Sequence, residues 1–306
     1  MRIVACGENL IDLIPAETIS TAESRWSALV GGSPLNTSLA LAKLGAPTQF
    51  LGRIGSDSFG RQIEEHLRVN GVGLDLAVRT EDPTSLAVVS LDEEGKAEYD
   101  FHFDGTSGFS WRDGELPELN TEDWLHFGSI GFVVGSGVDA LQEFVRTTKA
   151  STSFDINVRP TVIADPARYF ATVEPLMEAV GAAGGIVKAS DDDINWLSGT
   201  DQPLDQAEAW IKDYGLSMFL VTLGSDGAVA LRPDSKPVTV AGMQIDLVDT
   251  VGAGDTFMAG FLSQYVFDPG DLELALQYGA AASALVCTRK GANPPTLDEV
   301  NAFMRQ

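Results

Sequence analysis

Cysteine and histidine are scarce in this sequence. Its 306 residues include two cysteines, Cys6 and Cys287, at opposite ends of the chain. Two thiols so far apart form neither a disulfide framework nor the short Cys spacing of a zinc site. The three histidines are also far apart, and we interpret each as a surface or core residue. These absences exclude a small disulfide-stapled or zinc-stapled fold and favour a protein of the reduced cytoplasm.

Basic residues and long apolar runs are scarce as well. Lysine and arginine number 20 against 44 acidic residues, which makes the net charge −24. Because nucleic acids and anionic membranes are bound mainly through Lys and Arg, neither is an expected partner. No run reaches the length of about 18 apolar residues that a membrane helix needs. Glu8 and Asp12 interrupt the N-terminal apolar stretch, which therefore does not resemble a signal peptide.

The remaining composition is that of a globular protein. Hydrophobic residues make up 44% of the chain, and a chain of about 300 residues can bury about 75% of its unfolded surface. We interpret residues 10–14 as a continuation of the first predicted strand, which covers residues 2–6. The alternation of strands and helices predicts an α/β fold with a central, mostly parallel sheet and helices on both faces. The predicted strands cover 2–6, 48–53, 124–127, 152–154, 185–188 and 218–222, and the predicted helices cover 34–44, 59–69, 253–266 and 272–288.

One region departs from this alternation. Residues 84–103 contain two segments with a period of two, separated by a polar turn at 92–95. This pattern is typical of a β-hairpin without a crossover helix. We therefore expect a small β-sheet, built from parts of 10–30 and 84–103, attached to a single α/β domain that spans 1–306.

A glycine-rich turn at 249–257 follows a run of strand-like residues and opens the helix predicted at 253–266. Glycine lets backbone N–H groups converge, and a helix N-terminus adds partial positive charge, so this junction suits an anion. Asp255 is unexpected there, because a carboxylate repels phosphate unless it meets the nucleophile that attacks the phosphate. The alternative is that Asp255 is the N-cap of the helix, and the segment alone favours neither interpretation.

A second glycine pair, Gly31 and Gly32, also precedes a predicted helix. Adjacent glycines let a ligand approach the backbone closely, and Asn36 supplies donors and an acceptor for hydroxyl groups. Taken alone, this segment fits a simple turn better than a binding loop.

Together the two segments resemble the signatures of the ribokinase-like (PfkB) carbohydrate kinases. Residues 31–55 match the first signature at its glycines and at Asn36, and residues 249–260 match the DTxGAGD turn of the second. The resemblance runs over essentially the whole chain and implies a β-sheet lid over a sugar. It also implies that Asp255 is the catalytic base, and that an anion hole for the transferring phosphoryl group is formed by the backbone amides of Gly252, Ala253 and Gly254.

Further matches concern the sugar. Residues 7–15 and 154–160 are most similar to fructokinases, which favours fructose and transfer to its 6-hydroxyl. The second of these segments also resembles 2-keto-3-deoxygluconate kinases, so that sugar acid is the alternative substrate. Arg159, which we group with the catalytic residues, suits a phosphate or a carboxylate equally. The sugar contacts that the resemblance implies are Asp12, Gly31, Gly32, Asn36, Phe101 and Asn157.

The nucleotide side is implied by two other segments. Asp193 stands where an acid of the family acts on Mg²⁺ through water. Asp193 replaces Glu there and Ser190 replaces Asn, so an acidic first helical turn is the alternative. Asp249 corresponds to a loop that holds K⁺ in some relatives. The expected cofactors are ATP and Mg²⁺, with K⁺ a further candidate. The implied nucleotide contacts are Lys188, Ser190, Thr222, Gly224, Asp226 and Gly227.

Other classes of protein fit less well. An NAD-binding enzyme needs G-x-G-x-x-G directly after its first strand, but Gly7, Glu8 and Asn9 follow here. The sequence contains no G-x-x-x-x-G-K-[ST] string of a P-loop kinase. An inactive, sugar-binding relative would be expected to lose Asp255 or the glycine turn, and both are present. We expect a sugar kinase that binds ATP and a small sugar, and a homodimer paired through the lid.

Overall fold

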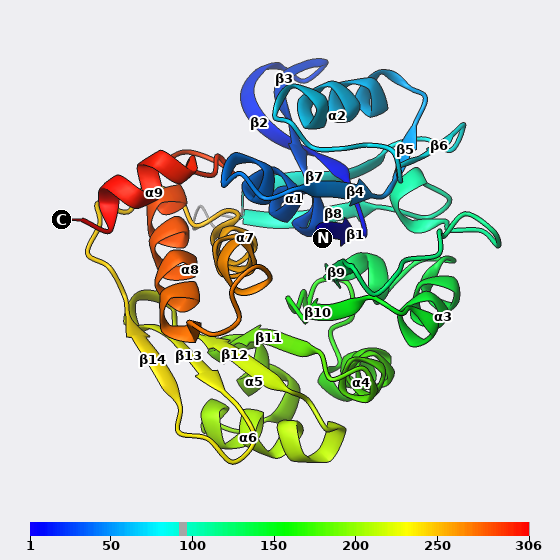
Figure 1. Ribbon diagram of the computed structural model, residues 1–306. Coiled ribbons are helices and arrows are strands. Elements are labelled where there is room, and N and C mark those ends of the chain that lie inside the picture. The colour runs from blue at the N-terminus through cyan, green and yellow to red at the C-terminus, as the bar shows by residue number, and fades with distance from the viewer. Residues whose placement is uncertain (92–96, 306) are drawn as a thin grey trace.

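A large β-sheet organises the computed structural model, which describes residues 1–91 and 97–305 (Figure 1). Its strand order is β14-β13-β12-β11-β10-β9-β1-β4. The strands from β12 to β4 run parallel, which confirms the predicted mostly parallel sheet. The antiparallel pairing of β13 and β14 at one edge was not predicted. The strands are β1 (Arg2–Cys6), β4 (Thr48–Leu51), β9 (Asp123–Gly128), β10 (Ser151–Asp155), β11 (Ile186–Ser190), β12 (Met218–Thr222), β13 (Gly227–Leu231) and β14 (Val238–Ala241).

Helices cover both faces of this sheet, as predicted (Figure 1). The central strands are apolar and buried on both sides, so each face requires a helical layer. Within the described ranges, none of these helices has the length and hydropathy to cross a bilayer. One layer contains α1 (Ser33–Lys43), α7 (Ala253–Tyr265), α8 (Leu272–Cys287) and α9 (Leu297–Phe303), and the other contains α3 (Val138–Thr147), α4 (Pro166–Ala182), α5 (Asp191–Ser198) and α6 (Pro203–Tyr214).

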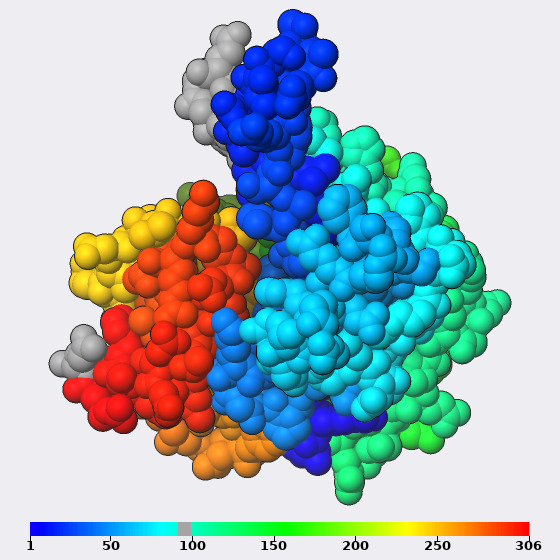
Figure 2. All heavy atoms as spheres, turned by 90° about the horizontal axis from the view of Figure 1, so that it is seen from above, coloured from blue at the N-terminus to red at the C-terminus, as the bar shows by residue number. Residues whose placement is uncertain are grey.

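The predicted small sheet is present, with the strand order β3-β2-β7-β8. Its strands are β2 (Leu10–Ser20), β3 (Glu23–Gly31), β7 (Ser85–Leu91) and β8 (Ala97–His102). The β2–β3 hairpin projects from the body of the molecule, and its outer half is exposed (Figure 2). The turn predicted at 92–95 lies outside the described residues.

Three sequence predictions of strands are corrected by the structure. Residues 10–14 do not continue the first strand: the chain leaves the large sheet at Gly7, and residues 10–14 enter the small sheet as part of β2. The strand predicted at 48–53 is split at Gly52, because β4 pairs with β1 whereas β5 (Arg53–Gly55) pairs with β6 (Val78–Thr80). The apolar run before residue 249 is not a strand, since Val248 and Asp249 donate hydrogen bonds to the Cys287 carbonyl instead of to a sheet.

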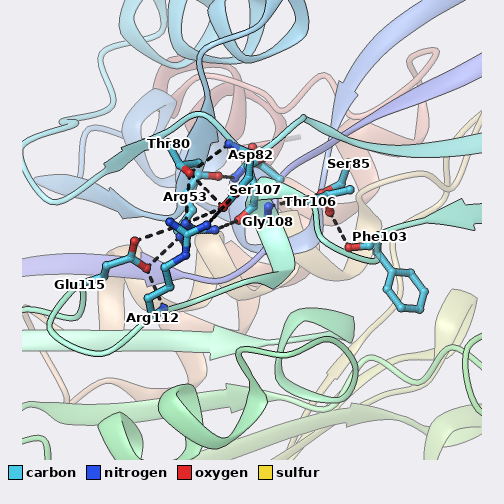
Figure 3. A network of polar contacts seen from close by, with 11 residues as sticks. Arg53, Thr80, Asp82, Ser85, Phe103, Thr106, Ser107, Gly108, Arg112 and Glu115 are labelled. Carbon is cyan, nitrogen blue, oxygen red and sulfur yellow. Dashed lines mark hydrogen bonds and ion pairs between the residues drawn. The ribbon is translucent and has the colours of Figure 1, made fainter.

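A buried arginine joins the small sheet to the body (Figure 3). The Arg53 side chain has no exposed surface, and its guanidinium lies 2.8 Å from Asp82 and 2.9 Å from Glu115. It also donates to the carbonyl of Ser107 at 3.1 Å. Ser107 follows β8, so these contacts anchor the C-terminal end of the β7–β8 hairpin. The base of the predicted lid is therefore held by a buried, charge-assisted network.

Candidate active site

The carboxyl ends of the parallel strands meet the N-terminus of α7 at one edge of the large sheet. Ligands of open α/β sheets bind at this edge. Asp155 ends β10 and Lys188 lies on β11, and the charges of both act on Asp255 in α7. Glu8, which follows β1, reaches the start of α1 through Ser33. Segments from both ends of the chain therefore converge on one site.

Asp255 is the third residue of α7, and Gly252 is the N-cap. The hypothesis that Asp255 caps the helix is therefore wrong. Its carboxylate instead accepts hydrogen bonds from α1: Ser33 Oγ lies 2.6 Å from Oδ1, and Asn36 Nδ2 lies 2.9 Å from Oδ2. Burial raises the pKa of Asp255, although these donors and the nearby charge of Lys188 oppose the shift. The result is one oriented, buried carboxylate beside the glycine turn.

The glycine turn depends on its lack of side chains. Gly252 has a φ of 78°, and a Cβ at this position would lie 2.9 Å from the Cβ of Ala292. The N–H of Ala253 donates to the Thr250 carbonyl at 3.1 Å. Within the described residues, the N–H groups of Gly252 and Gly254 donate to no acceptor. Two of the three predicted anion-hole donors are thus open to a ligand in this conformation.

Asp12 and Phe101 lie on one face of the small sheet. Asp12 pairs with Ala87 on β7, and Ala87 pairs with Phe101 on β8, so the three side chains form one row. Burial raises the pKa of Asp12 to about 6. Gly31 leaves room for this carboxylate, because a Cβ there would collide with it. Tyr99, which the sequence analysis missed, stacks on Phe101 with a centroid separation of 5.9 Å.

The surroundings of Tyr99 indicate where this face points. Burial raises the pKa of the Tyr99 phenol, and the charges of Asp12, Arg159 and Asp249 also act on it. Arg159 follows β10 and Asp249 precedes α7, so this face of the small sheet is turned toward the site edge. Arg159 itself is exposed, and its guanidinium donates to the carbonyl of Val158 at 2.9 Å.

Glu8 is a buried carboxylate that the sequence analysis did not assign to the site. It accepts hydrogen bonds from the N–H of Gly131 at 3.0 Å and from the N–H of Ser33 at 3.3 Å. Burial raises the pKa of Glu8 to about 7. Gly32, with a φ of 116°, lies so close that a Cβ would stand 2.6 Å from the Glu8 carbonyl oxygen. Since Ser33 also donates to Asp255, Glu8 helps to fix the position of the segment that holds the Asp255 carboxylate.

The other predicted residues lie at neighbouring strand ends. Ser190 and Thr222 are register partners on β11 and β12. The turn after β12 is exposed at Gly224 and Asp226, and Gly224 and Gly227 both have positive φ values. Asn157, which follows β10, also has a positive φ, of 44°, and its Nδ2 lies 3.4 Å from the hydroxyl of Ser129. These residues line the same edge of the sheet, without direct contacts to Asp255 among the described residues.

Both acidic residues predicted to act on metal ions accept hydrogen bonds from backbone N–H groups. Asp193 forms a capping box with Ser190 at the start of α5. Asp249 accepts from Val251 at 3.0 Å and from Gly291 at 2.8 Å, and so ties two loops together. Across residues 1–91 and 97–305, no group of three or more His, Cys, Asp or Glu side chains could hold a metal ion. A metal at this edge would need phosphate and water ligands, which is the usual situation for Mg²⁺.

Known proteins resemble this chain along its whole length. Residues 1–299 match the family described as pfkB family carbohydrate kinase. A fructokinase of Rhizobium leguminosarum bv. trifolii is 35% identical over 271 residues, which cover 87% of this chain and 80% of that protein.

Two crystal structures show the same fold. A fructokinase of Vibrio cholerae O395, in a form with bound fructose, ADP and calcium ion, has a TM-score of 0.86 at 27% identity, covering 99% of this chain and 98% of that chain. An aminoimidazole riboside kinase of Salmonella enterica, complexed with aminoimidazole riboside and an ATP analogue, has a TM-score of 0.85 at 25% identity, covering 99% and 100%. With the family match over nearly every residue and the shared fold, the chain belongs to the pfkB family of carbohydrate kinases.

Proposed function

We propose that this protein transfers the γ-phosphoryl group of ATP to a primary hydroxyl of a sugar, namely the 6-hydroxyl of fructose. One observation carries the proposal: the buried Asp255 carboxylate is held by Ser33 and Asn36 beside the open N–H groups of Gly252 and Gly254. The similarity to proteins named fructokinase favours fructose among the sugars of the family.

Phosphoryl transfer depends mainly on positioning and on stabilisation of charge. The glycine turn and the N-terminus of α7 supply oriented N–H dipoles for the transferring group. A carboxylate is too weak a base to remove the proton of an alcohol in advance. Asp255 would therefore orient the hydroxyl and accept its proton as the new phosphorus–oxygen bond forms. Ser33 and Asn36 hold the carboxylate in that orientation.

The sugar would lie between the small sheet and the start of α1. Asn36 directs its amide group to Asp255, while its Oδ1 is buried without a partner among the described residues. An unpartnered buried oxygen is costly unless a ligand donates to it, and a sugar hydroxyl suits this role. Asp12 would accept from another hydroxyl, and Phe101 would pack on the sugar. The remaining proposed contacts are Gly31, Gly32, Asn157 and Arg159.

ATP would approach along the ends of β11 and β12. The proposed contacts are Ser190, Thr222, Gly224, Asp226 and Gly227, whose exposed turn leaves room for a nucleotide. Mg²⁺ bound to the phosphates would neutralise their charge, and Asp193 would reach it through water. K⁺ beside Asp249 stays a prediction.

We also propose that two copies pair through the projecting β2–β3 hairpin. Ile19 and Trp26 are exposed there to 42% and 44%, and apolar side chains of this kind favour a protein partner. Sedimentation of the protein at micromolar concentration tests this pairing.

The two buried, unpaired thiols fit the cytoplasm that the sequence analysis predicts.

The substrate is tested by ADP release with fructose, 2-keto-3-deoxygluconate, ribose and adenosine side by side. Fructose should give the highest kcat/KM. Preference for the sugar acid would assign the alternative substrate, and Arg159→Ala should then reduce that activity more than activity on fructose. Inactivity with all of these compounds would refute the proposal.

The role of Asp255 is tested by Asp255→Asn. This variant keeps the shape and an acceptor for α1 but loses the base, so turnover should fall by about 10²–10⁴-fold. ATP affinity, measured by calorimetry, should change little. Retained turnover would remove the general-base role.

A further inference from the structure

Glu8 lies where the chain leaves β1 and turns toward the small sheet. The residue is 1% exposed, and its two carboxylate oxygens have different partners. Oε1 accepts from the N–H of Ser33 at 3.3 Å, and Oε2 accepts from the N–H of Gly131 at 3.0 Å. A Cβ on Gly131 would stand 2.8 Å from Oε2, so this glycine leaves room for the carboxylate. One buried carboxylate thus joins the start of α1 to the segment after β9.

The contact with α1 leads directly to the catalytic carboxylate. The N-cap of α1 is Gly32, which has no side chain, so Glu8 accepts one of the N–H groups left free at the start of the helix. The residue that donates this N–H, Ser33, also donates its hydroxyl to Asp255 at 2.6 Å. Asn36, one turn further along α1, donates to the other oxygen of Asp255. Glu8 therefore holds the helix end from which both donors to Asp255 project.

A second set of contacts leads from Glu8 to the sugar side. Glu8 also accepts a hydrogen bond from the side chain of Ser129, and Asn157 Nδ2 lies 3.4 Å from the hydroxyl oxygen of Ser129. Ser129 and Asn157 have φ values of 63° and 44°. Among the described residues, Asp234 is the one other non-glycine residue with a positive φ. Such strained residues cluster at active sites and persist where their surroundings hold them in place.

Stability does not explain the charge of Glu8. Among the described residues, no cation forms an ion pair with it. Burial raises the pKa of Glu8 to about 7, although hydrogen bonds from Gly131, Ser129 and Ser33 oppose the shift. A buried carboxylate without a cation costs free energy when it is ionised. A neutral side chain of the same size would be less costly to bury, so the carboxylate points to a role in the site.

We propose that Glu8 is a positioning residue that fixes Asp255, through Ser33, and Asn157, through Ser129, relative to each other. The catalytic base and a sugar contact are then aligned on the same sugar by one carboxylate between them. Glu8 itself touches no reacting atom, and the hydroxyl proton still goes to Asp255. This inference rests on the proposed function.

The first experiment measures Glu8→Gln at pH 8, where wild-type Glu8 is ionised. Gln keeps the size of the side chain but has one acceptor oxygen in place of two, so the contacts on both sides cannot be kept. The kcat/KM for fructose should fall by about 10–10²-fold, as expected for a small displacement of reacting groups. The KM for ATP should not change. Unchanged kcat/KM for fructose, or an equal loss of ATP affinity, would overturn the inference.

The same variant separates positioning from stability. Gln has no charge to bury, so Glu8→Gln should be no less stable than wild type at pH 8. Both proteins are assayed at a temperature where each is folded, as judged by circular dichroism. Loss of activity in a variant of equal or higher stability cannot come from unfolding.

The second experiment tests the two routes by double-mutant cycles. Ser33→Ala removes the hydroxyl that reaches Asp255, and Asn157→Ala removes the sugar contact. Glu8→Gln should therefore reduce kcat less in the Ser33→Ala background than in wild type, and raise the KM for fructose less in the Asn157→Ala background. Strictly additive losses in both backgrounds would overturn the inference.

Asp57 provides the matched control. Its carboxylate also accepts two backbone N–H groups, those of Gly60 and Thr84, both at 2.8 Å, but it contacts neither Ser33 nor Ser129 among the described residues. The effects of Asp57→Asn and Ser33→Ala on kcat should therefore be additive. Coupling as strong as that of Glu8→Gln would show a general effect of buried carboxylates and overturn the inference.

The failure of the proposed function gives a different result. If wild-type protein phosphorylates none of the sugars tested, the proposed function fails, but the side-chain amides of Asn36 and Asn157 still report the two sides of Glu8 by NMR. Glu8→Ala removes both acceptor oxygens, so both amides should exchange with water faster than in wild type. Asp57→Ala should change neither amide. A wild-type exchange rate at Asn36 or Asn157 in Glu8→Ala would overturn the inference whatever the sugar is.

Discussion

Two buried cations occupy different regions of this molecule, and they differ in how many groups surround them. Arg53, at the base of the small sheet, contacts Asp82, Glu115 and the Ser107 carbonyl around its guanidinium (Figure 3). Lys188, at the edge of the large sheet, is paired with Asp155 alone among the described residues and faces an open glycine turn. A cation surrounded by acceptors holds structure together, whereas one with a donor left over beside an anion site can act on a ligand.

The largest effect on stability should come from the arginine. Arg53→Met removes the buried cation between Asp82 and Glu115, and breaking a buried ion pair costs about 3–5 kcal/mol. The thermal midpoint should fall sharply, and Arg53→Lys, which keeps the charge but loses the planar fork, should be intermediate.

The contrast between the two cations fails if Arg53, like a residue of the site, affects the binding of a ligand. ADP with aluminium fluoride imitates the phosphoryl group during transfer. At temperatures where Arg53→Met is folded, its affinity for this pair should match the affinity of wild type. A selective loss of that affinity would show that the base of the small sheet also takes part in transfer.

A smaller effect should come from a buried acid without a cation. The pKa of Glu8 is about 7, against an ordinary value of 4.5, because burial favours its neutral form. The folded state therefore keeps a proton that the unfolded state loses, and stability falls as pH rises from about 4.5 to 7. Glu8→Gln removes this dependence.

Denaturation at two pH values checks this expectation. At pH 4, below the ordinary pKa of the carboxyl, Glu8→Gln should match wild type. At pH 8 it should be more stable by up to about 3 kcal/mol, since each unit of pKa shift is about 1.4 kcal/mol. A variant that is less stable than wild type at pH 8 would mean that the N–H groups of Gly131 and Ser33 stabilise ionised Glu8 by more than burial destabilises it.

The smallest effect should come from the outer part of the arginine network. Arg112 pairs with Asp82 at 2.8 Å but is 62% exposed. Exposed pairs contribute about 0–1 kcal/mol, so Arg112→Ala should scarcely change the thermal midpoint. A loss as large as that of Arg53→Met would show that burial does not separate these two arginines.

Much of the site follows from local sequence, but its pairings do not. The glycine turn and the Gly31–Gly32 segment pointed to Asp255 and Asn36, and the structure joins these two residues at 2.9 Å. The pairing of Asp155 with Lys188 was missed, although both stand at the ends of predicted strands. Carboxyl ends of neighbouring parallel strands meet at one edge, so this pair could have been predicted if β10 and β11 had been placed side by side.

By itself, the sequence determined the alternation of strands and helices, the small extra sheet and the glycine turn at the start of α7. These features depend on local periodicity and on glycine, which act within a few residues. Only the tertiary structure decided that residues 10–14 leave the large sheet, that β13 and β14 run antiparallel, and which buried charges meet. Strand neighbours and desolvated ion pairs depend on contacts between distant segments, such as Asp155 and Lys188, which no local pattern records.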